Sequence, residues 1–369
     1  MAAFYRSFHD WFWAESFWLP GNTTWAEVHA RKNLRVVQAG ELYLCLPIAV
    51  ALIVLRVAFE RLIASPFVQS LGVKDKKINF TPNPFCEKVY QTINKFPPSD
   101  RILGLSKQIG WTTREVERWF RHRRMQSKPS LLKKAKESSW RFVFYTGATI
   151  YGFCILYKEK WLWDTDHCFI GYHGHVMSEE LYIYYVVELG FYVSLTISQF
   201  VDVQRKDFWQ MLIHHIVTIL LLSFSYAAAF FRIGAVIVLV HDVSDVFLEA
   251  AKVANYAKLR QLCDCLFVLF AISFFVARLF IYPVWVIYPT VYVTVEYLGD
   301  FPSRILFLTL LSLLQILHIF WGWSIIVVVY RLSHGKDAKD VRSDEESSAV
   351  EDEEKAKRDG NPPENKKHQ

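Results

Sequence analysis

Two adjacent histidines, His214 and His215, lie inside the apolar run QMLIHHIVT at residues 210–218. A second apolar run, VLVHDVSDVFLEAAK, follows at residues 238–252. It carries four ionisable residues: His241, Asp242, Asp245 and Glu249. An ionisable side chain at bilayer depth costs roughly 2.5–3.5 kcal/mol on insertion scales, so such residues point to function by default. These two runs therefore hold the side chains that we expect to do chemistry.

The spacing of these residues predicts that they face each other from two neighbouring helices. On a helix, Asp242, Asp245 and Glu249 fall at i, i+3 and i+7, on one face, and His241 lies one turn before Asp245. His214 lies roughly 9 Å from the start of its helix at about 1.5 Å per residue, and Asp245 lies roughly 10 Å from the end of the next. We therefore expect an imidazole of the first run to contact a carboxylate of the second.

Imidazole and carboxylate groups held together in this way suit acyl transfer. A neutral imidazole can take a proton from an attacking group or attack a thioester itself, while a carboxylate fixes its tautomer. A water-poor site strengthens these interactions and discourages hydrolysis. Two other interpretations remain open, namely histidines that only pack and a single zinc ion held by both clusters. We predict no metal and no cofactor, because the sequence lacks the histidine boxes of membrane di-iron enzymes.

Four further charged or polar residues lie just before the first run or in later apolar runs. Arg205 and Lys206 precede the first run, where a polyphosphate headgroup such as that of coenzyme A would dock. Ordinary charges that set membrane topology are the equal alternative. Arg278 and His318 lie in later apolar runs. Snorkelling or hydrogen bonds between helices explain them as well as a place in the site does, so we assign them no role.

The composition predicts an all-α polytopic membrane protein. Of the 369 residues, 53% are hydrophobic and 16% are aromatic, and several apolar runs are long enough to cross a bilayer. We predict seven transmembrane helices, one at the N-terminal side and six that form the core. They cover residues 42–62, 140–157, 181–201, 208–230, 233–251, 263–289 and 304–330.

Charge predicts how the chain is oriented. Residues 66–141 contain 17 Lys and Arg against 6 Asp and Glu, which places this stretch in the cytosol by the positive-inside rule. With seven spans, the N-terminal segment 1–41 is then luminal and the tail from Arg331 is cytosolic. Asn22 begins an Asn-Thr-Thr triplet, a glycosylation acceptor that is usable only on the luminal side. We therefore predict glycosylation of Asn22.

The cytosolic region 66–129 contains a helix-turn-helix pattern at residues 98–128. Gly110 breaks the first helix, Thr112 or Thr113 caps the second, and Val116, Trp119 and Phe120 form its apolar face. The segment WFRHRR (119–124) resembles the recognition helix of homeodomains, but His122 stands where homeodomains use an Asn to bind adenine. We also expect little room for a full helix before residue 98. Both departures argue against DNA binding.

The tail at residues 333–369 mixes charges with Pro, Gly, Ser and Asn, so we predict that it is disordered. Ser343 and Ser348 each have an acidic residue three positions later, the pattern that acidophilic kinases use. They are therefore phosphorylation candidates. A solvated tail without any switch is the alternative.

Several motifs together resemble the animal ceramide synthases that carry a homeobox-like insert. They are FWLPGNTTW (17–25), ERWFRHRRMQSKPSLLKK (117–134), SSWRFVFY (138–145), QRKDF (204–208), HHIVT (214–218), HDVSDVFLEAAK (241–252) and DVRSDEE (340–346). The resemblance implies a catalytic TLC (TRAM-LAG1-CLN8) membrane domain at about residues 131–332, with His214, His215, Asp242 and Asp245 at its active site. It implies transfer of a fatty acyl group from acyl-CoA to a sphingoid base in the endoplasmic reticulum membrane.

The resemblance says less about the length of the acyl chain that the enzyme prefers. Residues 242–264 look closest to family members that prefer palmitoyl-CoA, while residues 291–301 depart from the palmitoyl type in a loop that influences chain length in the family.

The competing function is a seven-span lipid receptor or transporter that uses its buried polar groups without catalysis. The sequence also leaves open whether the chain acts alone or in a homo- or hetero-dimer.

Overall fold

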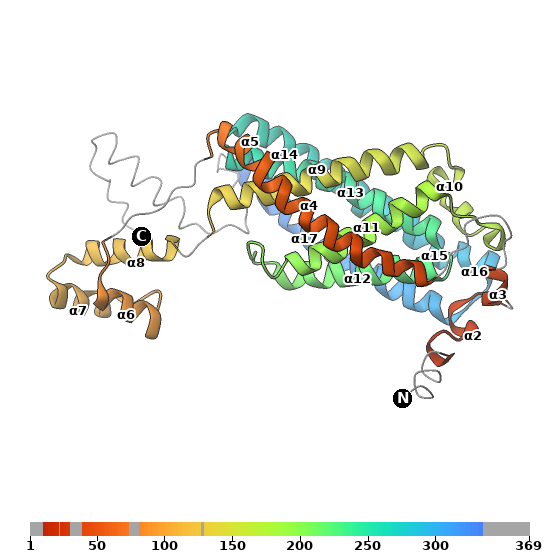
Figure 1. Ribbon diagram of the computed structural model, residues 1–369, viewed down its shortest axis with the longest axis horizontal. Coiled ribbons are helices and arrows are strands. Elements are labelled where there is room, and N and C mark those ends of the chain that lie inside the picture. Colours follow the sequence, from red (N-terminus) through yellow and green to blue (C-terminus); the bar gives the residue numbers. More distant parts are fainter. Residues whose placement is uncertain (1–9, 22, 30–38, 74–80, 127–128, 335–369) are drawn as a thin grey trace. The chain divides into compact units, whose positions relative to one another are not determined.

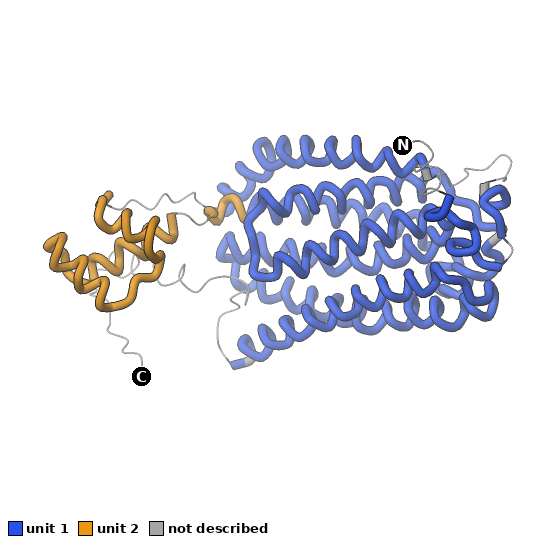
Figure 2. The backbone as a smooth tube through the Cα atoms, turned by 90° about the horizontal axis from the view of Figure 1, so that it is seen from below, with its two compact units in different colours: residues 1–73, 135–339 blue, residues 74–134, 340–369 orange. Residues whose placement is uncertain are grey.

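The computed structural model of the chain describes residues 10–21, 23–29, 39–73, 81–126 and 129–334. Within those ranges the chain is helical and contains no strand, so the all-α prediction is confirmed. The predictions at Asn22, Ser343 and Ser348, and that of a disordered tail beyond residue 334, lie outside the described residues. The chain divides into two units, residues 1–73 with 135–339 and residues 74–134 with 340–369 (Figure 2).

In its described residues, the first unit contains five helical stretches that are long and apolar enough to cross a membrane. They are Gly40–Ser70, Glu179–Ser198, Phe208–Ala227, Arg260–Leu298 and Pro302–Leu332. Their main helices are α4 (Cys45–Phe59), α11 (Glu179–Ser198), α12 (Phe208–Ala227), α14 (Arg260–Phe274) and α17 (Pro302–Ser333). The first stretch also includes η1 (Ala39–Leu44), η2 (Glu60–Ala64) and α5 (Ser65–Ser70). The protein is therefore polytopic, as predicted.

The two remaining predicted spans lie in α9 (Leu131–Leu156) and α13 (Phe231–Tyr256). Each helix has 26 residues, which at about 1.5 Å per residue exceeds the roughly 30 Å of a bilayer core. Helix α13 is as long as the five apolar stretches require, but it is less apolar because it carries the ionisable residues of the second run. α13 packs against α11, α12 and α14 within the bundle of Figure 1.

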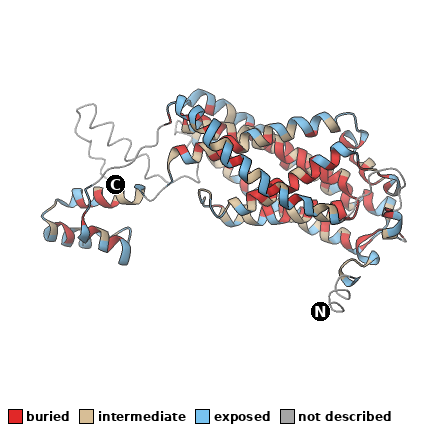
Figure 3. Cartoon of the chain, viewed as in Figure 1, coloured by how far each residue is buried: buried red, intermediate tan, exposed pale blue. Residues whose placement is uncertain are grey.

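Helix α11 is the most deeply covered of these helices, and Figure 3 shows the buried residues gathered inside the bundle. It packs against α4, α12 and α13. Gly190 allows α4 to approach closely, because a Cβ atom at this position would lie 2.7 Å from Cγ2 of Ile48 and 3.2 Å from the carbonyl oxygen of Cys45. The contact between α4 and α11 therefore depends on the missing side chain.

The fourth apolar stretch changes its helical period after α14. Two π-helical segments follow, η5 (Phe275–Ile281) and η6 (Pro283–Ile287), and then α15 (Tyr288–Val291) and α16 (Val293–Leu298). Pro283 lacks a backbone N–H and cannot donate within an α-helical ladder. Segments with π-helical bonds often mark functional sites in helices. Here the altered period sets the direction of Arg278.

Short elements complete the first unit. They are α2 (Glu15–Trp18), α3 (Trp25–His29), α10 (Lys160–Trp163), η3 (Thr165–Cys168) and η4 (Tyr172–Gly174). Trp18 is fully buried against Phe224 of α12, and its carbonyl oxygen accepts a hydrogen bond from Ser303 of α17 at 3.0 Å. The N-terminal elements are thus attached to the bundle by burial as well as by a hydrogen bond.

Between residues 81 and 126 the second unit contains three helices, α6 (Pro84–Thr92), α7 (Ser99–Ile109) and α8 (Thr113–Gln126). The predicted helix-turn-helix is confirmed, with Gly110 in the left-handed region at φ 76° and Thr112 and Glu115 forming a capping box. The predicted apolar face of α8 is buried. The expectation of little room before residue 98 is wrong, because Asn83 caps a nine-residue α6 there.

Two of the arginines on α8 hold this unit together. Arg123 donates a forked pair of hydrogen bonds to the Glu87 carboxylate of α6, at 2.8 and 2.9 Å. This contact lowers the pKa of Glu87. Arg124 donates to the carbonyl oxygen of Lys95 at 2.9 Å. Part of the basic charge of α8 therefore has a structural use within the unit.

The close approach at Gly190 leads to a prediction about stability. Gly190→Ala places a methyl group against Ile48, so we expect overpacking to cost about 1–3 kcal/mol despite the better helix propensity of Ala. Gly147 of α9 has open space at its Cβ position, so Gly147→Ala is the matched control and is expected to raise stability slightly. Thermal unfolding of detergent-solubilised protein, followed by size-exclusion chromatography, measures both. Equal melting temperatures for the two variants would contradict the packing argument.

Candidate active site

A tight turn brings the two predicted runs to the same level. Helix α12 ends at Ala227 and α13 begins at Phe231, so three residues join two antiparallel neighbours. Ala229 adopts a positive φ of 58° in this turn. Because the two helices meet at one short turn, His214 and His241 lie a similar distance from it. Their ring centroids are 6.2 Å apart and the rings are stacked.

Four buried histidines form what we call the imidazole cluster: His214, His215, His241 and His318. The ring centroids of His214 and His215 are 5.8 Å apart, and those of His241 and His318 are 4.8 Å apart. His318 comes from α17, so the cluster joins three helices. The sequence suggested a place in the site for His318 but could not separate it from an ordinary buried hydrogen bond.

The partners of His241 and His318 fix their tautomers in the neutral form. Nδ1 of His241 lies 2.6 Å from the carbonyl oxygen of Ile237, which can only accept, so this nitrogen carries the proton. Nε2 of His241 then accepts from Nε2 of His318 at 2.9 Å. Nδ1 of His318 is left as a buried acceptor without a partner among the described residues. These two rings form an oriented pair.

His215 is oriented by a residue that the sequence did not single out. Its Nδ1 lies 3.0 Å from Oε1 of Gln199, and Nε2 of the same amide donates to the carbonyl oxygen of Phe208 at 2.7 Å. The amide orientation makes Nδ1 of His215 the donor, which leaves Nε2 with a lone pair. Nδ1 of His214 has no partner among the described residues, and its ring contacts those of Tyr192 and Trp321.

The predicted contact between imidazole and carboxylate is not formed, and this expectation is wrong. Oδ2 of Asp245 accepts from Nη2 of Arg278 at 2.7 Å, and the same nitrogen donates to the carbonyl oxygen of His241 at 2.8 Å. Neither oxygen of Asp242 has a donor among the described residues. The π-helical turn η5 brings Arg278 to α13, and its guanidinium group takes the carboxylate that we had paired with an imidazole.

The remaining predicted residues lie at the charged end of the bundle. Glu249 pairs with Lys252 at 2.6 Å and does not belong to the imidazole cluster. Arg205 is half-buried within electrostatic range of Glu249, and Lys206 is exposed. Further ion pairs at this end join α4, α9 and the segment after α11, from Arg56 and Arg141 to Asp202. This end therefore presents charge to a polar ligand.

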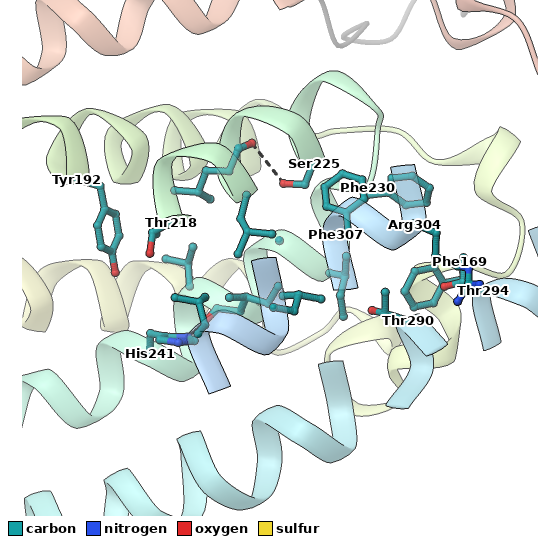
Figure 4. A pocket seen from close by; sticks show the side chains of 18 of the residues that line it. Phe169, Tyr192, Thr218, Ser225, Phe230, His241, Thr290, Thr294, Arg304 and Phe307 are labelled. Atoms are coloured by element: carbon teal, nitrogen blue, oxygen red, sulfur yellow. Dashed lines mark hydrogen bonds between the residues drawn. The ribbon is translucent and has the colours of Figure 1, made fainter. Parts of the chain in front are cut away.

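An apolar cavity leads away from the imidazole cluster (Figure 4). Tyr192, Thr218 and His241 line one end, next to the cluster, and Phe169, Phe230, Thr290, Thr294, Arg304 and Phe307 line the other (Figure 4). Leu311 and Leu314 of α17 line the wall between them. The cavity is thus mostly apolar, with the imidazole of His241 at one end, and such a lining suits a hydrocarbon chain.

Metal ligation was the rival interpretation of these residues. Across the described ranges, no group of three or more His, Cys, Asp or Glu side chains has the geometry to hold a metal ion. The imidazoles of His241 and His318 instead bind each other, and the Asp245 carboxylate binds Arg278.

Comparison with known proteins places this site in a family. Residues 134–327 match the family model described as the TLC domain, TRAM_LAG1_CLN8, and residues 74–129 match the homeodomain model. The chain is therefore a membrane protein with a TLC domain and a homeodomain.

Relatives along most of the chain narrow the class. Ceramide synthase 5 of Mus musculus is 45% identical over 92% of this chain and 82% of its own length. Ceramide synthase 4 of Homo sapiens is 42% identical over 93% of this chain and 87% of its own length, and ceramide synthase 3 of Homo sapiens is 40% identical over 92% and 89%. The chain belongs to the ceramide synthase family, as its motifs predicted.

The buried ion pair of this site is open to a direct test. We expect Arg278→Gln to destabilise the protein by about 3–5 kcal/mol, because it leaves the Asp245 carboxyl without its partner. The double variant Arg278→Gln with Asp245→Asn removes both members and recovers part of that loss. Thermal unfolding of the single and double variants in detergent measures the coupling. Strictly additive losses would show that the pair contributes nothing to stability.

Proposed function

We propose that this protein is an acyltransferase that moves a fatty acyl group from acyl-CoA to the amine of a sphingoid base, sphinganine or sphingosine, to give dihydroceramide or ceramide. The observation that carries the proposal is the imidazole cluster at the head of an apolar cavity, in a chain of the ceramide synthase family. The cluster supplies the basic nitrogens and the cavity supplies the space for an acyl chain. Family membership supplies the class of product.

The proposed reaction exchanges one bond to the acyl carbon for another. The C–S bond of the thioester breaks and a C–N bond forms, while the ammonium nitrogen of the base loses two protons. One proton ends on the sulfur of coenzyme A and the other leaves the site. Gln199 accepts a hydrogen bond from Nδ1 of His215, which leaves Nε2 of His215 as the base. This nitrogen carries the proton that ends on the sulfur of coenzyme A. His214, whose Nδ1 has no partner among the described residues, is the candidate for a transient acyl-imidazole.

Charge along the bundle supports the direction in which acyl-CoA binds. The ion pairs of Arg56, Arg141 and Lys252, together with Arg205, lie at one end, and the apolar cavity extends the other way. The phosphates of coenzyme A therefore bind at the charged end and the acyl chain enters the cavity. Together with the positive-inside rule, this arrangement supports a charged end at the cytosolic face of the endoplasmic reticulum membrane and an N-terminus in the lumen.

The length of the cavity supports a long acyl chain. Along α17 the cavity lining runs from Arg304 to Leu314, which are 10 positions apart, or about 15 Å at about 1.5 Å per residue. An extended chain advances about 1.2 Å per bond, the value implied by roughly 3.6 Å per three-bond residue, so this wall faces about 12 carbons of an acyl chain. A preference for palmitoyl-CoA stays the prediction made from residues 242–264.

The roles of the two adjacent histidines can be tested with membranes that contain each variant. We expect His214→Ala and His215→Ala each to lower the N-acylation of sphinganine by palmitoyl-CoA at least about 100-fold, the usual size of acid–base catalysis. His167→Ala, on an exposed ring outside the cluster, is the control and should keep full activity. Mass spectrometry of the lipid product gives the rates. Full activity with both residues removed would exclude the histidine mechanism, and no ceramide from the unmutated protein would exclude the function.

The far end of the cavity is expected to set chain length. Phe307→Ala opens space near Arg304, so we expect the optimum in a ladder of acyl-CoA substrates to move to longer chains. Leu314→Trp fills the cavity next to the imidazole cluster and should shift the optimum to shorter chains. Ile305→Ala, on an outward face of the same helix, is the matched control. An unchanged optimum in both cavity variants would place the acyl chain elsewhere.

A further inference from the structure

Arg56 on α4 is a buried arginine that lies outside both matching family models, which cover residues 74–129 and 134–327. Only 8% of its surface is exposed, and its guanidinium group makes two ion pairs. Nε donates to Glu60 one turn later at 2.7 Å, and Nη2 donates to Oδ1 of Asp202 at 2.6 Å. A buried ion pair adds little net stability, so its geometry is more informative than its energy. The second pair attaches Asp202 to the first apolar stretch.

Asp202 belongs to a connector, residues 199–207, which joins the end of α11 to the start of α12. Gln199 closes the connector, because its Nε2 donates to the carbonyl oxygen of Phe208 at 2.7 Å. The backbone N–H of Asp202 donates to the carbonyl oxygen of Ser198 at 2.8 Å. Asp202 therefore follows Gln199 by three positions in a closed segment, and the place of one constrains the place of the other.

The two ends of the connector lead to the two adjacent histidines. At the first end, Gln199 holds Nδ1 of His215 at 3.0 Å. At the second end, the buried Asp207 accepts a hydrogen bond from Nε1 of Trp321 at 3.3 Å. The ring of Trp321 lies edge-on to that of His214, with 5.5 Å between the centroids. The connector thus contacts His215 directly and His214 through one side chain.

Binding a phosphate of coenzyme A is the alternative role for Arg56. Its two partners are both carboxylates, from Glu60 and Asp202. The attraction that a nearby cation exerts on an anion is cancelled when carboxylates already lie against that cation. Arg56 therefore has little charge left for a phosphate, and its contacts favour a role in holding the connector.

We propose that Arg56 is a positioning residue of the active site, which acts on His215 through the connector. Arg56 fixes Asp202, and Asp202 fixes the start of the connector. Gln199 then keeps the ring of His215 turned so that Nε2 is the nitrogen left to act as the base. Without the ion pair the connector can shift, and the Gln199 amide no longer holds one orientation of the ring. This inference rests on the proposed acyl transfer.

The test measures kcat and KM separately, with palmitoyl-CoA and sphinganine, per amount of folded protein in a size-exclusion peak. Misplacing a group by about 1 Å can cost about 100-fold, so we expect Arg56→Gln to lower kcat at least about tenfold. KM for palmitoyl-CoA should stay within about twofold, because no contact with coenzyme A is removed. Asp202→Asn breaks the same ion pair without changing the shape of the side chain and should give the same result. Arg56→Lys keeps a charge for Asp202 and should recover part of kcat.

A matched control and a double variant test the route itself. Arg61→Gln makes the same substitution at an exposed position of the same apolar stretch and should leave kcat unchanged. Gln199→Leu removes the last contact of the route and should lower kcat about as much as Arg56→Gln does. The double variant of Arg56→Gln with Gln199→Leu should then be no more than about twofold slower than the slower single variant, since coupled residues do not act additively.

Three results would overturn the role of Arg56. They are losses that multiply in the double variant, a raised KM for palmitoyl-CoA at unchanged kcat in Arg56→Gln, and an equal loss of kcat in Arg61→Gln. An unmutated protein that forms no ceramide would instead overturn the acyl transfer itself.

Discussion

The structure depends on one constraint, which is that a polar group buried in a membrane bundle must find its partner on another helix. Water is not present in the bilayer core to satisfy it, and each unmet group costs several kcal/mol. Arg278 meets this constraint by binding Asp245 and the carbonyl oxygen of His241 together. The bond between His241 and His318 fixes α13 against α17 at the same level. These bonds hold the helices in register more specifically than apolar contacts do.

The same bonds decide which groups are free to react. His241 and His318 use their facing nitrogens on each other, and Asp245 is bound to Arg278. His215 keeps one lone pair because Gln199 occupies the opposite nitrogen. Some polar residues therefore hold the helices together, while others keep a nitrogen that is not hydrogen-bonded. The latter, His214 and His215, belong to the cluster whose His241 lines the cavity.

The sequence predicted the elements and the depth of the site because both depend on local patterns. Apolar length predicted the long helices, and residue counts from the outer helix ends predicted that His214 and Asp245 lie at one level. The partner of Asp245 could not be predicted, since it comes from a π-helical turn 33 positions later in the chain. In the second unit, α6 was missed because it is only nine residues long and its start depends on the Asn83 cap.

The division of the bundle into a charged end and an apolar end also limits how any substrate can bind. Under the proposed acyl transfer the substrates are a sphingoid base and an acyl-CoA, which each join a polar head to a long hydrocarbon chain. Each head must then lie toward Arg56, Arg141 and Asp202, because otherwise charge is left buried in the cavity. The same proposal has both reacting groups meet at the level of His214 and His215, next to His241 at the head of the cavity. Contacts with the hydrocarbon chains of the substrates thus help to hold the reacting atoms in position, as remote contacts do in other enzymes. The imidazole cluster lies between the charged end and the cavity, so it lies at a level where both requirements are met.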